Sequence, residues 1–238
     1  MSTKKKLLVV FTTLVAVVAI VAISVMATVA YLTSSSAVSN VFTIGDVGIT
    51  FTETAVDQDG IAIPDAPRRD TNSYLLVPGK RYIKDPTINV NSTSVPSYAF
   101  VIARNDLAAA EETEGDALTM AEQAVENGWR IYTPKSDALT PATGKVYVYC
   151  GTQNEDAYNE KGVPVVANKS YKMFDYFQLK TNADVSLYSA AKVTLSAYAI
   201  QADSFVDDTE PSGLSALDKA WAAIIEHFPI ITKTSANV

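Results

Sequence analysis

The sequence predicts a mainly β protein, a jelly-roll-like antiparallel β-sandwich with one or two helical insertions and a C-terminal amphipathic helix. Three observations support this fold class. Short segments in which apolar and polar residues alternate recur along the chain, and turn-forming residues separate them. Helical patterns are too few to connect successive strands of a parallel sheet, which needs a long crossover between each pair.

The expected strands share this alternation. They are residues 41–54, 74–77, 82–90, 97–103, 130–133, 146–150, 172–180 and 192–201. In the first segment, Val47, Ile49 and Phe51 occupy alternate positions, as in a half-buried strand. The last segment presents two sets on opposite faces, namely Val193, Leu195, Ala197 and Ala199 against Thr194, Ser196, Tyr198 and Ile200.

Two turns are predicted early in the chain. Asp57–Gly60 is rich in turn residues and should reverse the chain after the first strand. Pro78-Gly79-Lys80 has Pro at the first corner and Gly at the second, the order of a type II turn. We therefore expect residues 82–90 to pair with residues 74–77.

A first helix is predicted at residues 116–127. Asp116 can cap its start, and Gly128 can take the left-handed position after its end. Leu118, Ala121 and Val125 should share the face that packs on the domain.

A second helix is predicted after Ser212. Its apolar residues recur at helical spacing, and Pro229 ends the run. The stripe consists of Leu214, Leu217, Trp221, Ile224, Ile225 and Phe228. This stripe should pack against the domain core.

The first thirty residues have the layout of an export signal. Lys4, Lys5 and Lys6 precede an apolar run over residues 7–25, and small residues follow it. Cleavage is expected between Ala30 and Tyr31, which divides the chain into a signal peptide at 1–30 and one extracellular domain at 31–238. Retention as a membrane anchor is the alternative, because the apolar run is long enough to span a bilayer.

The charge balance narrows the range of partners. The chain has 19 Lys and Arg residues against 26 Asp and Glu, and removal of residues 1–30 changes the formal charge from −7 to −10. An acidic surface repels phosphate backbones and anionic lipid head groups. We therefore expect no nucleic-acid partner, and membrane association only through an uncleaved signal.

The sequence offers little catalytic chemistry. Cys150 is the single cysteine, so an intrachain disulfide is excluded, and it ends an alternating strand pattern typical of a buried thiol. His227 is the single histidine and lies where it can face the negative end of the last helix. Zinc sites built on two histidines are excluded by count, and we expect no catalytic residues.

Clustered acids raise the question of a metal. Glu111–Asp116, and Asp207-Asp208 with Glu210, could recruit calcium through their carboxylates. Neither cluster has the spacing of an EF-hand loop, and Asp57–Gly60 lacks its terminal Glu. The expectation is solvated loops and no cofactor, with structural calcium as the alternative.

Several segments resemble the TasA and camelysin group of bacterial proteins, which carry the SipW-dependent type of signal peptide. The head motifs are Ala27–Thr33 and Asn40–Ile49. Leu76–Lys80, Lys84-Asp85-Pro86 and Val193–Ala202 resemble members of the same group. The resemblance is scattered over most of the chain.

This resemblance implies a jelly-roll domain, exported through a SipW-type signal peptidase to a Gram-positive cell envelope or biofilm matrix. TasA-like members polymerise into fibres by donor-strand exchange, in which an N-terminal strand completes the sheet of the next subunit. The partner would then be a second copy of this chain, and the leader 31–40 would pair outside its own domain. The donor anchors would be Val38, Val41, Phe42 and Ile44. The alternative is that this leader is a loose terminus.

Two other functions compete with a structural role. A monomeric surface adhesin would use exposed aromatics, for which the candidates are Tyr74, Tyr82, Tyr98, Tyr147 and Tyr149. A metallopeptidase is implied by the label of camelysin-like relatives. One histidine argues against that activity, because no familiar set of zinc ligands with a general base can be assembled.

Overall fold

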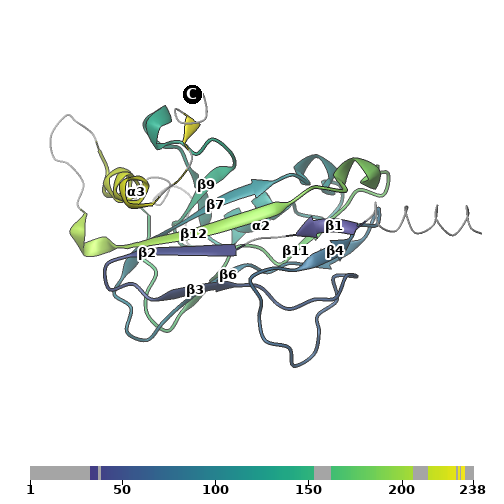
Figure 1. Ribbon diagram of the computed structural model, residues 1–238, viewed down its shortest axis with the longest axis horizontal. Coiled ribbons are helices and arrows are strands. Elements are labelled where there is room, and N and C mark those ends of the chain that lie inside the picture. The colour runs from purple at the N-terminus through teal and green to yellow at the C-terminus, as the bar shows by residue number, and fades with distance from the viewer. Residues whose placement is uncertain are drawn as a thin grey trace, which may run out of the picture.

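The computed structural model describes residues 33–36, 39–152, 162–205, 214–228, 230 and 232–233. It confirms a mainly β protein (Figure 1). The strands are β1 (Thr33–Ser36), β2 (Ser39–Ile44), β3 (Ile49–Thr52), β4 (Ser73–Leu75), β5 (Arg81–Ile83), β6 (Thr87–Val90), β7 (Ser97–Asn105), β8 (Trp129–Tyr132), β9 (Lys145–Tyr149), β10 (Ser170–Lys172), β11 (Tyr176–Gln178) and β12 (Val193–Gln201). The α-helices are α2 (Met120–Glu126) and α3 (Ala216–His227), and short 3-10 turns join other elements.

One large sheet organises the fold, with the strand order β2-β12-β7-β9-β8. Strands β12 and β7 pair antiparallel along their full length, from Val193 opposite Asn105 to Gln201 opposite Ser97. Strands β9 and β8 continue the antiparallel arrangement. Strand β2 alone among the described strands of this sheet runs parallel to its neighbour.

Smaller sheets pack against one face of the large sheet. They are β10-β6-β3, β11-β5 and β1-β4. The core between the layers joins Phe51 and Ile88 of the small sheets to Val101 and Leu195 of the large one, all of them buried. Each fully buried side chain of this size contributes about 1.5 to 3 kcal/mol to folding.

Helix α3 covers the opposite face of the large sheet (Figure 1). Trp221 and Ile224 are buried against Tyr198 and Phe100. The Trp221 indole N–H donates to the Leu139 carbonyl at 2.7 Å, which satisfies the polar atom of a buried ring. The alternation predicted for β12 is therefore confirmed, since both of its faces are buried in different clusters.

The single strand predicted at 41–54 is wrong. The chain breaks after Ile44, so that β2 joins the large sheet and β3 joins a small one. Gly45 has a φ of +85°, a conformation that glycine adopts at little cost. This turn carries the chain from one layer to the other.

The predicted pairing of residues 74–77 with 82–90 is also wrong. Strand β4 pairs with β1, and β5 pairs with β11. Residues 82–90 are split because Pro86 has no N–H to continue a ladder, so β6 begins afterwards beside β3. The predicted strand at 172–180 is also interrupted, since β10 ends at Lys172 and β11 begins at Tyr176. The predicted turns at Asp57–Gly60 and Pro78-Gly79-Lys80 are present.

Helix α2 starts later than predicted, and a different face is buried. Thr119 is its N-cap and forms a capping box with Glu122, in place of Asp116. The buried residues are Met120, Gln123 and Ala124. The expected face of Leu118, Ala121 and Val125 is wrong because a polar residue, Gln123, faces inward, where its amide donates to the Leu118 and Tyr176 carbonyls.

Helix α3 starts at Ala216, after a capping box of Ser215 and Asp218. Its buried stripe contains Leu217, Trp221 and Ile224 as predicted, whereas Leu214 precedes the helix and is exposed. No helix among the described residues combines the length and apolar character needed to cross a membrane.

Candidate assembly edge

Strand β2 forms one edge of the large sheet (Figure 1). It pairs in parallel with β12, from Ser39 opposite Leu195 to Ile44 opposite Ile200. The backbone groups of β12 on this side are thus satisfied by the most N-terminal strand of the large sheet.

Phe42 anchors this strand. Its ring stacks on Tyr198 of β12, with ring centroids 4.8 Å apart and planes 10° apart. Phe228, directly after α3, contacts the same ring at 5.1 Å and an angle of 59°. Phe42 therefore lies in an aromatic slot built by β12 and the end of α3, a geometry that stabilises ring pairs beyond the area they bury.

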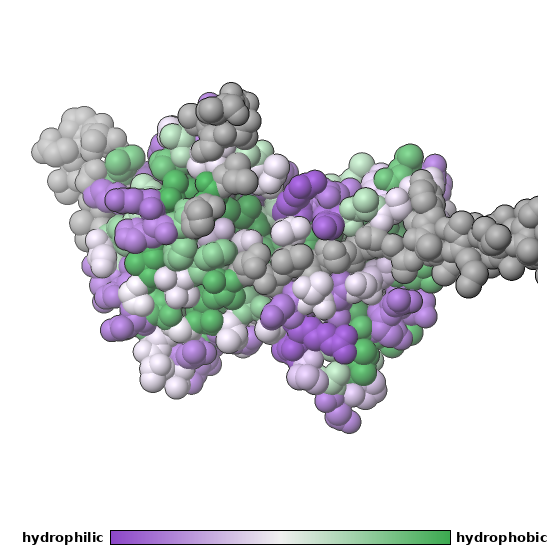
Figure 2. Space-filling view, viewed as in Figure 1, coloured by the Kyte–Doolittle hydropathy of each residue, from purple (hydrophilic) through white to green (hydrophobic). Residues whose placement is uncertain are grey.

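The predicted donor anchors do not behave alike. Phe42 and Ile44 pack, half-buried, against the cluster beneath α3, whereas Val41 is 38% exposed. Figure 2 shows hydrophobic surface on the side of the molecule that carries β2 and α3. Val38 and the predicted cleavage site, Ala30 and Tyr31, lie outside the described residues.

The leader 31–40 does not extend away from its own domain where it is described. Strand β1 pairs antiparallel with β4, with Thr33 opposite Leu75 and Ser36 opposite Ser73. Residues Ser39 and Asn40 already belong to β2. Within a single chain the described part of the leader therefore pairs with its own domain, and its pairing with a second copy stays a prediction.

The sequence predicted that the acidic tract Glu111–Asp116 would be solvated throughout, but one of its side chains is buried. Glu111 is only 2% exposed, and it accepts hydrogen bonds from Asn105 Nδ2 at 2.5 Å and from the Met120 N–H at 2.6 Å. Burial raises the pKa of its carboxyl. Within the described ranges no three His, Cys, Asp or Glu side chains cluster as metal ligands, and Asp207, Asp208 and Glu210 lie outside those ranges.

Cys150 and His227 lie where the sequence placed them. Cys150 is buried, and burial raises the pKa of its thiol, which disfavours the reactive thiolate. His227 is in the last turn of α3, where its Nδ1 lies 2.7 Å from the Ala223 carbonyl oxygen.

The tyrosines proposed as an adhesive surface are not exposed. Tyr74, Tyr82 and Tyr147 are buried, and Tyr98 and Tyr149 are half-buried. Their rings and hydroxyls are used internally: the Tyr82 hydroxyl donates to the Leu75 carbonyl at 2.7 Å, for example. The sequence could not reveal this, because aromatics suit both faces of a strand.

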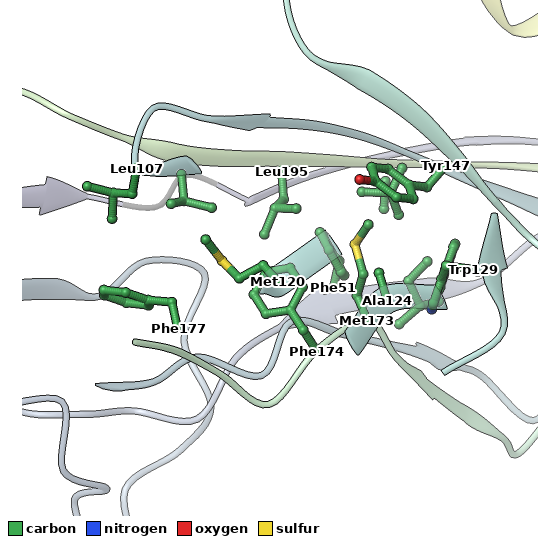
Figure 3. Packing of buried hydrophobic residues seen from close by; sticks show 14 of the residues in the cluster. Phe51, Leu107, Met120, Ala124, Trp129, Tyr147, Met173, Phe174, Phe177 and Leu195 are labelled. Atoms are coloured by element: carbon green, nitrogen blue, oxygen red, sulfur yellow. The ribbon is translucent and has the colours of Figure 1, made fainter. Parts of the chain in front are cut away.

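A cavity of about 410 Å³ lies between α2 and the large sheet. Met120, Met173, Phe174 and Tyr147 contribute to its lining (Figure 3). Glu111 also borders it, with both carboxylate oxygens already bonded. Sequence reasoning missed this cavity because its lining comes from distant segments of the chain.

A buried ion pair was also missed. Lys84 Nζ lies 2.6 Å from Glu53 Oε2, and the two side chains are 1% and 3% exposed. The Lys84-Asp85-Pro86 motif drew attention to Lys84, but nothing in the sequence linked it to Glu53.

No protein-family model matches this chain, and neither a curated protein nor a solved structure is detectably similar to it.

Proposed function

We propose that this chain is an exported structural protein of a cell envelope or biofilm matrix, and that it self-assembles by exchanging β2 between copies. The observation that carries the proposal is the edge position of β2. It is parallel to β12, precedes the other strands of its sheet and is anchored by one aromatic ring.

Connectivity makes β2 an exchangeable strand. It is joined to β3 through the short turn that starts at Gly45, and no other strand of the large sheet must separate when it leaves. Departure would expose the backbone of β12 and empty the slot of Tyr198 and Phe228. The same segment of a second copy supplies the same ladder and the same ring.

Exchange joins two different surfaces, namely strand β2 of one copy and the exposed edge of β12, with its aromatic slot, in the next copy. Such a contact is heterologous and need not close into a ring, so it produces a fibre. The pairing of β1 and β2 within their own chain then represents the closed monomer. Signal removal between Ala30 and Tyr31 by a SipW-type peptidase would release the N-terminal side of this strand.

The fold and the motifs support the same function. The two packed layers are compatible with the jelly-roll-like sandwich that the TasA and camelysin resemblance implies. The chain is acidic and has one cysteine, and its described residues contain no cluster of metal ligands. Packing and assembly would then supply its stability outside the cell.

Negative-stain electron microscopy of purified residues 31–238 tests the proposal, with a chain starting at Gly45 as the control. We expect fibres from the first and none from the second. A synthetic peptide of residues 31–46 should bind the truncated chain, whereas the same peptide with Phe42→Ala should bind more weakly. Monomers from residues 31–238 under all conditions, with no peptide binding, would refute self-assembly and favour a monomeric surface protein.

A further inference from the structure

The buried pair of Lys84 and Glu53 is held from both sides by backbone pairing. Glu53 follows β3 and exchanges two backbone hydrogen bonds of 2.8 Å with Arg69. Lys84 follows β5, and its N–H donates to the Asp175 carbonyl at 3.0 Å. The Lys84 and Glu53 side chains are therefore held in contact, with Nζ and Oε2 separated by 2.6 Å.

One oxygen of this pair is left over. Glu53 Oε1 has no hydrogen-bond partner, and it is the one buried side-chain N or O atom in that condition among the residues described. Nearby polar groups already have hydrogen-bond partners. The Tyr74 hydroxyl donates to the Ile83 carbonyl. The side-chain amide of Asn72 donates to the Thr54 carbonyl and accepts from the Val56 N–H. A carboxylate normally needs several donors when buried, so this site is poorly suited to a charged Glu53.

Desolvation favours the neutral form of the Lys84 amine. Burial lowers the pKa of Lys84, against the opposing effect of Glu53. Transfer of one proton across the 2.6 Å contact converts ammonium and carboxylate into amine and carboxylic acid. A neutral amine is a nucleophile, and a neutral carboxyl group is an acceptable electrophile.

We propose that Lys84 and Glu53 condense into an intramolecular isopeptide bond. The Lys84 Nζ lone pair attacks Glu53 Cδ, the Nζ–Cδ bond forms, and one Cδ–O bond breaks. The departing hydroxyl takes a proton from nitrogen and leaves as water, so the reaction consumes no co-reactant. Fixed contact supplies the effective concentration that the reaction between free groups lacks.

The bond would give this chain the covalent link that its single cysteine cannot provide. It joins the end of β3 to the end of β5, which are separated by 31 residues. A cross-link of this span restricts the unfolded chain in the way a disulfide does. It also removes a buried charge pair and leaves an amide in its place.

Intact-mass spectrometry of the purified full chain, under denaturing conditions, tests this proposal. We expect a mass lower than the sequence mass by one water molecule, after allowance for any signal removal. Protease digestion should yield a branched peptide that joins Lys84 to Glu53. An unmodified mass would overturn the proposal.

Matched variants exclude other sources of water loss, such as succinimide formation at Asp59-Gly60. Lys84→Met should restore the full mass, and Lys145→Met, at an exposed lysine, should retain the loss. Water loss that persists in Lys84→Met would overturn the assignment. So would loss of one ammonia molecule with Lys84 joined to Asn72, because the acceptor would then be the amide.

Discussion

The two edges of the large sheet are built differently. Strand β8 at one edge is antiparallel to β9 and follows α2 after Gly128. Strand β2 at the other edge is parallel to β12 and precedes the rest of the sheet. Strand β8 follows a helix that packs on the same domain, whereas the segment before β2 is the four-residue strand β1, which pairs with the three-residue β4.

The anchors of the two edges show the same contrast. Trp129 of β8 is fully buried, its indole N–H donates to the Lys172 carbonyl at 3.0 Å, and its ring meets Tyr149 edge-on. Phe42 of β2 is half-buried and has no polar atom to fix it. Each edge thus has one aromatic anchor, but Trp129 is both buried and hydrogen-bonded, whereas Phe42 is held by ring contacts alone.

The largest expected effect is at the β8 edge. Trp129→Ala removes a fully buried ring and should lower the free energy of unfolding by about 3 to 5 kcal/mol. Urea denaturation followed by circular dichroism measures this change. Ile131→Ala, on the same strand but 51% exposed, is the control and should change stability by less than about 0.5 kcal/mol. Equal effects of the two substitutions would contradict an anchor at Trp129.

At the β2 edge, which we propose to be exchangeable, Phe42→Ala should lower the free energy of unfolding by about 2 kcal/mol or less, because only part of the ring is buried. Its main effect should be local: faster amide hydrogen exchange in β2 and β12, and loss of fibres. Val41→Ala on the same strand is the control, since Val41 is exposed. Faster exchange throughout the sheet would mean that β2 unfolds with the rest of the domain.

Helix α3 connects the two edges across the outer face. The Tyr132 hydroxyl of β8 donates to Asp218 Oδ1 at 2.8 Å, and Phe228 contacts Phe42 of β2. Ser215→Ala removes the N-cap of α3 and should cost about 1 kcal/mol. Thermal unfolding measures the loss, and Ser215→Asp, which retains a capping oxygen, should restore most of it.

The smallest effect is a pH dependence at Asp218. Burial alone would raise the pKa of this carboxyl, but donors from the Ser215 N–H, the Tyr132 hydroxyl and the Ser215 hydroxyl lower it below its usual value. The depressed pKa stabilises the folded state above the pKa of an unfolded Asp, and this stability is lost as the pH falls through the folded value. Asp218→Asn should remove that acid sensitivity at a cost of about 0.5 to 1 kcal/mol. Denaturation midpoints that fall with acidification equally in both proteins would refute the assignment.

Local sequence patterns predicted the elements that can be recognised from their own periodicity, without knowing which elements they pack against. Strand β12 was predicted because its two faces alternate over nine residues, and the stripe of α3 because three of its apolar residues recur at helical spacing. The break at Gly45 was missed because Val47 to Phe51 continued the alternation on its far side. A one-dimensional pattern does not reveal that a strand changes sheets.

The surroundings of the residues in the candidate sites were not visible in the sequence pattern. Glu111 looked like one acid in a solvated tract, yet Asn105 and the start of α2 surround it. Phe42 was predicted as an anchor, but its slot comes from Tyr198 and Phe228 near the other end of the chain. The surroundings of Phe42 could not be predicted because its ring partners come from a distant part of the chain. The partners of Glu111 are close in sequence, but a local pattern does not show that its carboxyl is buried.

The head-to-tail exchange of β2 would give any fibre built by it a polarity. Every subunit must point the same way, so the two tips differ chemically: one presents a vacant β12, and the other an unused β2. A copy that lacks β2 can accept a strand but cannot donate one. Small amounts of such a truncated copy should therefore block growth at one tip and leave the opposite tip active.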